Sequence, residues 1–152
     1  MQQGLKWEVM QNQYPSNLII PAAGMGTRLQ YKTKNIPKIM VKLNDKTIFQ
    51  YQLEMLKTFS GISDIHFILG YKADLLSQYV NSLDLPYKVH FYKNEDYSST
   101  GCSFSLLKVL NRIRNSFIYL NSDLIISEKS LSKLLNNEKD NLILLRSLKN
   151  KK

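Results

Sequence analysis

The stretch Leu18–Leu29 reads LIIPAAGMGTRL, an apolar run that stops at a proline and leads into a turn with two glycines. A short apolar run bounded by Pro and Gly is typical of a buried strand. Gly24 and Gly26 allow tight backbone turns, so several N–H groups can approach one anion. The stretch therefore predicts a strand over 17–22 that is followed by a phosphate-binding turn.

The residues around this turn limit which phosphates it can hold. It is not a Walker loop, because no Gly-Lys-Ser/Thr follows, and a dinucleotide fingerprint would need a third glycine where Leu29 stands. The acid that such a fingerprint places near the end of the second strand is also missing, because Gly70 and Tyr71 stand there. Instead Arg28 follows directly and Lys38 lies about ten residues on. A guanidinium forks onto phosphate oxygens and an ammonium acts as a point charge, so both are candidate phosphate partners.

Strand and helix patterns alternate along the rest of the chain. We expect strands over 17–22, 64–70, 87–93, 116–123 and 141–147, an extended segment over 36–43, and helices over 47–60, 73–83, 103–113 and 128–137. Ser98, Ser99 or Thr100 is expected to cap the third helix. The alternation predicts an α/β protein, a Rossmann-like three-layer α/β/α arrangement with a mainly parallel sheet.

Ligands of such sheets bind beyond the carboxyl ends of the strands, where two further features fall. Asp123 ends the strand FIYLNSD, and a carboxylate there is suited to Mg²⁺, which neutralises a triphosphate. The segment NEDYSSTGCSFS offers candidate contacts to a base or an anion, namely the helix start at Thr100 and Gly101 and the side chains of Asn94, Tyr97 and Ser105.

Composition sets the class of protein and of partner. The chain has 152 residues, the size of one domain, and a formal net charge of +9. Its basic residues are spread out, and an anionic small molecule explains the cluster around Lys32, Lys34 and Lys38 as well as nucleic acid does, so we expect no nucleic-acid partner. Cys102 is the single cysteine, and apolar runs are too short for a bilayer, which favours a cytoplasmic protein without membrane insertion.

The two histidines carry little weight at this point. His66 and His90 each lie inside a predicted strand, so both are assigned structural roles. The sequence shows no zinc-ligand spacing and no nucleophile elbow.

The residues PAAGMGTRL followed by Pro37-Lys38 resemble the G-x-G-T-R…P-K signature of nucleotidyltransferases. These enzymes make activated sugars or alcohols from a nucleoside triphosphate and a phosphorylated acceptor. The segments YKNEDYSSTGCSFSLLKVL and FIYLNSD look most like bacterial choline-phosphate cytidylyltransferases, with sugar-1-phosphate nucleotidyltransferases next. The resemblance runs from about residue 17 to residue 127 and implies the nucleotide-diphospho-sugar transferase-like fold.

The resemblance also implies roles for individual residues. It places Ala22, Ala23 and Gly24 against the base and ribose, and it wraps the phosphates with Met25, Gly26, Thr27 and Arg28. Lys38 is the lysine at the reacting phosphate, and Asp123 binds Mg²⁺. The expected substrates are a nucleoside triphosphate, CTP favoured, and an acceptor such as phosphocholine or a sugar 1-phosphate, with pyrophosphate released.

One departure from the family pattern concerns the carboxyl-terminal side. Family members usually carry a second metal-binding Asp well beyond the first, whereas Asp140 follows Asp123 too closely for that role. We therefore expect residues 1–16 to be an extension and residues 17–152 to be the nucleotide-binding portion of a domain whose acceptor-binding part is missing. A catalytically incomplete nucleotide-binding module is the alternative, and the oligomeric state stays open.

Overall fold

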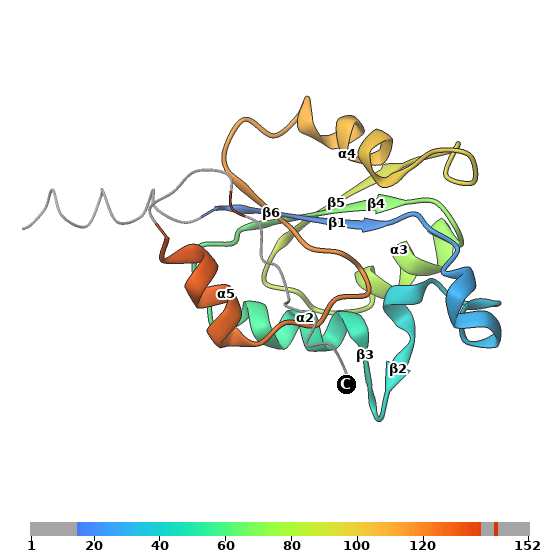
Figure 1. Ribbon diagram of the computed structural model, residues 1–152, viewed down its shortest axis with the longest axis horizontal. Helices are drawn as coiled ribbons and strands as arrows, with labels where there is room; N and C mark the ends of the chain where they lie inside the picture. The colour runs from blue at the N-terminus through green and yellow to red at the C-terminus, as the bar shows by residue number, and fades with distance from the viewer. Residues whose placement is uncertain (1–14, 138–141, 143–152) are drawn as a thin grey trace, which may run out of the picture.

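The computed structural model describes residues 15–137 and residue 142, and it is built around a four-stranded sheet (Figure 1). The order of elements is β1 (Asn17–Ala22), η1 (Thr27–Thr33), η2 (Lys38–Met40), β2 (Lys42–Leu43), β3 (Lys46–Thr47), α2 (Ile48–Leu56), β4 (Asp64–Leu69), α3 (Ala73–Asn81), β5 (Lys88–Lys93), α4 (Cys102–Leu110), β6 (Phe117–Tyr119) and α5 (Glu128–Leu135).

The sheet has the strand order β5-β4-β1-β6, and every neighbouring pair is parallel. Since β1 lies between β4 and β6, the chain first builds one side of the sheet and then crosses back to the other. The carboxyl ends of all four strands therefore lie at one edge, which confirms the predicted parallel α/β architecture.

Helices cover both faces of this sheet, because side chains alternate along each strand. Leu18, Ile20 and Phe67 point to the face that α2, α3 and α5 cover, where Phe49 packs edge-on against Phe67. Ile19 and Ile68 point to the opposite face, under α4. The result is the expected three-layer arrangement, with α4 above the sheet and the other three helices below it in Figure 1.

The prediction that residues 36–43 are extended is wrong for residues 38–40. Residues Lys38–Met40 form one turn of 3₁₀ helix, in which the Met40 N–H donates to the Pro37 carbonyl at 2.9 Å. Only Lys42–Leu43 is a strand, and it pairs antiparallel with β3 in a small separate hairpin. The apolar alternation that suggested a strand instead buries Ile39 in the main core.

The expected side-chain cap of the helix α4 is also wrong. Gly101 occupies the N-cap position, with no side-chain cap. The Thr100 hydroxyl is engaged elsewhere, because it donates to the Asp96 carbonyl at 2.7 Å and accepts from the Asn94 amide at 2.9 Å. The strand β1 has the expected bounds, and the other expected strands and helices are shorter than predicted. Most of the strand expected over 141–147 and most of the expected extension lie outside the described residues.

No helix among the described residues has both the length and the apolar character needed to cross a bilayer.

Candidate functional site

Backbone hydrogen bonds hold the loops at the carboxyl edge of the sheet together. The Tyr71 N–H donates to the Ala23 carbonyl at 2.9 Å, so the segments after β1 and β4 leave the sheet side by side. The Asn94 N–H donates to the Leu69 carbonyl at 2.8 Å and fixes the start of the loop after β5. The loops that carry the predicted site residues thus start from a rigid base.

Gly26 makes the turn after β1 possible. Its φ of 65° lies in the left-handed region, where a side chain is strained. A Cβ there would also lie 3.1 Å from the Thr33 Cγ2 and 3.3 Å from the Lys38 Cβ. The Gly26 carbonyl accepts hydrogen bonds from the Leu29 N–H and the Thr33 hydroxyl, both at 2.9 Å. The glycine therefore lets the turn pack directly against η1 and the base of Lys38.

Gly24 differs from Gly26, because it faces open space. A Cβ at Gly24 would meet no atom within 4 Å. Its neighbours Met25, Thr27 and Arg28 are exposed as well, whereas Ala22 and Ala23 are buried. The turn therefore presents an exposed stretch of backbone to a ligand and anchors that stretch at both ends.

Lys38 and Asp123, 85 residues apart in the sequence, form an ion pair beside this turn. The Lys38 Nζ donates to the Asp123 Oδ2 at 2.8 Å. The Lys38 side chain is 20% exposed and that of Asp123 is 44% exposed, so both remain within reach of a ligand. Two of the predicted charged residues are thus in direct contact.

The electrostatics of Asp123 fit this pairing. Partial burial on its own raises the pKa of this carboxyl, but the hydrogen bond and charge of Lys38 lower it, and the charge of Arg28 adds to the effect. The net result is a pKa below the ordinary value, so Asp123 is an anion at neutral pH.

Gln52 positions the Asp123 loop, and sequence reasoning missed it. This α2 side chain is 1% exposed, and its Nε2 donates to the Asn121 carbonyl at 3.0 Å and to the Leu124 carbonyl at 2.8 Å. The two carbonyls flank Ser122 and Asp123, so one buried amide clamps the turn that holds the carboxylate. A polar residue on the buried face of an apolar helix was the available signal.

The loop after β5 is organised around Asn94, which is buried. Its Nδ2 donates to the hydroxyls of Thr100 and Ser105 at 2.9 and 3.0 Å, and its Oδ1 accepts from the Asp96 N–H at 3.2 Å. Three predicted nucleotide contacts are therefore bonded to one another in this structure. Gly101 is exposed at the start of α4, with open space around its Cβ position.

Gly70 is a second residue that sequence reasoning passed over. A Cβ there would lie 2.6 Å from the Tyr97 Cβ and 2.7 Å from the Ala23 carbonyl oxygen. The absence of a side chain lets the turn after β4 approach both the glycine turn and the loop after β5. The acid that a dinucleotide site needs here has no room, which agrees with the exclusion drawn from the sequence.

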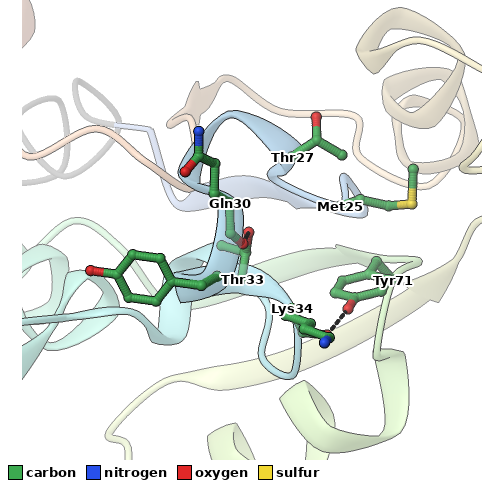
Figure 2. A pocket seen from close by; sticks show the side chains of 7 residues that line it. Met25, Thr27, Gln30, Thr33, Lys34 and Tyr71 are labelled. Carbon is green, nitrogen blue, oxygen red and sulfur yellow. Dashed lines mark hydrogen bonds between the residues drawn. The ribbon is translucent and has the colours of Figure 1, made fainter.

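A pocket of about 480 Å³ opens on the flank of the glycine turn (Figure 2). It is lined by Met25, Thr27, Gln30, Tyr31, Thr33, Lys34 and Tyr71. The Tyr71 hydroxyl donates to the Lys34 carbonyl, the contact drawn as a dashed line in Figure 2, and so ties the loop after β4 to the end of η1. The space beside the turn is therefore bounded by polar and aromatic side chains and one lysine.

The chemistry of Asp123 suits the expected metal. Mg²⁺ binds hard oxygen ligands and is commonly held by one or two carboxylates together with substrate phosphates. Asp123 supplies one half-exposed, ionised carboxylate next to the phosphate-binding turn. The residues present therefore fit a Mg²⁺ ion that is shared with a bound nucleotide.

Comparison with known proteins agrees with this geometry. CTP:phosphoglutamine cytidylyltransferase of Campylobacter jejuni is 33% identical over 126 residues, covering 79% of this chain and 48% of the relative. Choline-phosphate cytidylyltransferase of Streptococcus pneumoniae is 39% identical over 100 residues, covering 66% of this chain and 42% of the relative. The chain thus spans about half the length of the curated relatives that it matches.

A solved structure of CTP:phosphocholine cytidylyltransferase from Streptococcus pneumoniae superposes with a TM-score of 0.59 at 36% identity, covering 70% of this chain and 44% of that one. Residues 18–150 match the sequence pattern of the MobA-like NTP transferase domain, which is nearly the whole chain. The glycine turn, the lysine–aspartate pair at the edge of a parallel sheet and this match together place the chain in the MobA-like NTP transferase family.

Proposed function

We propose that this chain binds a nucleoside triphosphate at the carboxyl edge of its sheet and serves nucleotidyl transfer to a phosphorylated small molecule. The observation that carries the proposal is the contact between Lys38 and Asp123 beside the exposed turn at Gly24. It combines backbone N–H groups, a cation and a carboxylate within one site. Those are the groups that a triphosphate and its metal require.

The proposed reaction needs no general base. A phosphate oxygen of the acceptor attacks the α-phosphorus and forms a new P–O bond. The bond from that phosphorus to the bridging oxygen breaks, and its electron pair leaves with pyrophosphate. Since the acceptor phosphate is already an anion at neutral pH, no proton has to be removed from it. Alignment and charge neutralisation are what the protein must supply.

Lys38 contributes to the alignment and to the charge neutralisation by exchanging its ionic partner. Without nucleotide its ammonium group neutralises Asp123 at 2.8 Å. A triphosphate bound at the glycine turn offers Lys38 a denser negative charge, so the lysine can leave Asp123 for the phosphates. The Asp123 carboxylate would then be free to hold a divalent metal ion. Lys38 thus keeps Asp123 compensated in the empty site and moves toward the phosphates as the site fills.

Arg28 and the backbone complete the anion site. Arg28 is exposed next to the glycine turn, and we assign its guanidinium to the phosphates. The Mg²⁺ ion that Asp123 would hold supplies further neutralisation of the phosphate charge. The turn around Gly26 fixes the direction of the N–H groups before the ligand binds.

The choice of base and acceptor rests on the relatives. Both curated relatives described above are cytidylyltransferases, one named for phosphoglutamine and one for phosphocholine. We therefore propose CTP as the nucleotide and a small phosphorylated molecule, such as phosphocholine, phosphoglutamine or a sugar 1-phosphate, as the acceptor. Direct contacts from Asn94, Thr100 and Ser105 to the base remain predictions. Cytoplasm, where nucleoside triphosphates are made, is the proposed compartment.

A magnesium-dependent pyrophosphate assay tests the proposal. CTP, GTP and UTP are each combined with phosphocholine, phosphoglutamine and a sugar 1-phosphate, and nucleotide binding is measured in parallel by calorimetry. Pyrophosphate release that needs both substrates supports the transferase. Binding of a nucleotide with no release in any combination supports the incomplete binding module. Absence of nucleotide binding contradicts both.

A further inference from the structure

The two histidines of the chain lie side by side near the amino end of the sheet. His66 on β4 and His90 on β5 are register partners, and their rings stack with centroids 4.6 Å apart and an interplanar angle of 11°. Asp64 lies two residues before His66 and so faces the same side of the sheet. This arrangement gathers three potential ligands on two adjacent strands, which is a rigid scaffold.

The three side chains are close enough to share one ion. The His90 Nε2 lies 2.7 Å from the Asp64 Oδ1, and one ligand atom from each of the three residues lies within 4.8 Å of the others. Tetrahedral zinc, with bonds of about 2.0–2.2 Å, separates its ligand atoms by about 3.3 Å. The required adjustment is therefore a small opening at His90 and a small approach of His66.

Neighbouring side chains hold these groups in fixed directions. The His66 Nε2 donates to the Asn17 Oδ1 at 2.9 Å, which leaves the lone pair on Nδ1. The Tyr92 hydroxyl donates to that lone pair at 3.1 Å, so an ion bound there replaces this hydrogen bond. The Ser63 hydroxyl donates to the second oxygen of Asp64. Outer hydrogen bonds of this kind fix the tautomer and direction of metal ligands.

We propose that Asp64, His66 and His90 form a binding site for a divalent transition ion, best matched by Zn²⁺. Two imidazoles and one carboxylate are a borderline ligand set with room for a water molecule in the fourth position. The ion takes the place of the His90 Nε2 proton that points to Asp64, and that proton moves to Nδ1, because a neutral imidazole carries one ring proton. His90, with a side chain 40% exposed, is free to tilt out of the stack as this requires.

The protonation states suit this ligand set. Burial lowers the pKa of His66, with the nearby His90 adding to the effect, so the His66 ring is neutral at pH 7. Hydrogen bonds from Ser63 and His90 lower the pKa of Asp64 and keep it ionised. The charge of Lys88 acts on Asp64, and Arg112 lies over the Tyr92 ring at 5.5 Å from its centroid. Because like charges repel, these two cations limit the affinity of the cluster for a metal ion.

The site is separate from the proposed nucleotide site. Asp64 begins β4, whereas the glycine turn and Asp123 lie beyond the opposite ends of the strands. An ion here would join β4 to β5 without touching a nucleotide. Ion binding at this cluster is therefore independent of nucleotide binding.

Titration of the chelator-treated protein with Co²⁺, a spectroscopic substitute for Zn²⁺, tests the proposal. We expect one equivalent to bind and give visible absorption, with both histidine ring signals shifting in NMR spectra. The variants His90→Asn and Asp64→Asn, checked for folding by circular dichroism, should each bind at least tenfold more weakly. Asp123→Asn, which alters only the proposed nucleotide site, should bind Co²⁺ like the wild type. A Cys102→Ser variant controls for binding by the thiol.

Equal Co²⁺ affinity in wild type and in folded His90→Asn would overturn the proposal, as would binding that is lost in Asp123→Asn or Cys102→Ser instead. Absence of any binding to the wild type would show that the cluster is a hydrogen-bonded network only. CTP binding measured on the same samples reports the nucleotide site separately.

Discussion

The two ends of the central sheet are both polar, but they are built in different ways. At the carboxyl end the polar groups sit on loops, are largely exposed, and meet in one exchangeable ion pair between Lys38 and Asp123. At the amino end Asp64, His66 and His90 project from the strands themselves and are hydrogen-bonded to their neighbours. Groups on loops can change partners when a ligand arrives, whereas groups on strands keep their backbone positions and can only reorient their side chains.

The largest expected effect concerns the exchangeable pair. Lys38→Ala and Asp123→Asn should each lower pyrophosphate release by about 10²–10³, because each removes a charge that stabilises the phosphates. Lys46→Ala is the matched control, since it removes an exposed ion pair of similar length, 2.7 Å, to Glu54. Initial rates with CTP and phosphocholine give the comparison. Near-wild-type rates in both site variants would remove the proposed roles.

Two substitutions in the glycine turn should affect different quantities: one should lower the stability of the fold, and the other should weaken nucleotide binding. Gly26→Ala should lower the free energy of unfolding by about 1–2 kcal/mol, because alanine is strained at its positive φ and crowds Thr33 and Lys38. Gly24→Ala should leave that free energy unchanged, because its Cβ meets nothing within 4 Å, yet weaken nucleotide binding by intruding on the ligand. Urea unfolding and calorimetry measure the two quantities. Equal unfolding free energies for both variants would contradict this account of the turn.

Removal of the Gln52 side chain, which clamps the Asp123 loop, should have a smaller effect on the free energy of unfolding. Gln52→Leu removes two hydrogen bonds to the Asn121 and Leu124 carbonyls, but it also removes the Gln52 Oε1, which is buried without a hydrogen-bond partner among the described residues. A net loss of about 1 kcal/mol in unfolding free energy is expected.

The same substitution should weaken the magnesium dependence of CTP binding, because the carboxylate loses its support. Gln78→Leu, an exposed glutamine on α3, is the control and should change neither quantity. Unaltered magnesium dependence in Gln52→Leu would show that this glutamine is a packing residue only.

The smallest effect is expected at the amino end of the sheet, on the pH dependence of the free energy of unfolding measured in the presence of EDTA. Burial lowers the pKa of His66 in the folded state below the ordinary histidine pKa of about 6.5, which the unfolded chain keeps. Below a pH of about 6.5 the unfolded chain therefore binds more protons than the folded one. Stability should therefore be full above that pH and decline as the pH falls toward the folded pKa. His66→Asn should flatten this decline between pH 7.5 and 5.5 in urea unfolding. An equally steep decline in the variant would place its origin elsewhere.

Local patterns were enough to predict the architecture. The apolar run before Gly24 and the strand end at Asp123 were expected at one edge of the sheet, and the structure places them there, because parallel strands bring their carboxyl ends together. The roles of these residues in binding stay predictions. The contact between Lys38 and Asp123 follows from that topology, although no local pattern gives its distance.

Other features depend on contacts between distant segments and were out of reach. Gly70 matters through the Ala23 carbonyl and the Tyr97 side chain on other loops, and nothing around it in the sequence indicates this. Gln52 is marked in the sequence only as a polar residue on an apolar helix face, which does not reveal that its partner carbonyls lie on the Asp123 loop. The histidines seemed unrelated at positions 66 and 90 because sheet register, and not sequence spacing, brings them together. The segment 36–43 was predicted to be extended because it has the apolar pattern of a strand. In the structure Pro37 begins a 3₁₀ turn, and Ile39 of that turn is buried as a strand residue would be.

The assignment of Asp123 to the nucleotide site is best tested by calorimetric titration with CTP, with and without Mg²⁺, of wild type, Asp123→Asn and His90→Asn. Wild type and His90→Asn are expected to bind CTP more tightly with Mg²⁺, whereas Asp123→Asn is expected to lose this dependence. Magnesium-dependent binding that survives unchanged in Asp123→Asn, or no CTP binding by the wild type, would contradict the assignment of the nucleotide site.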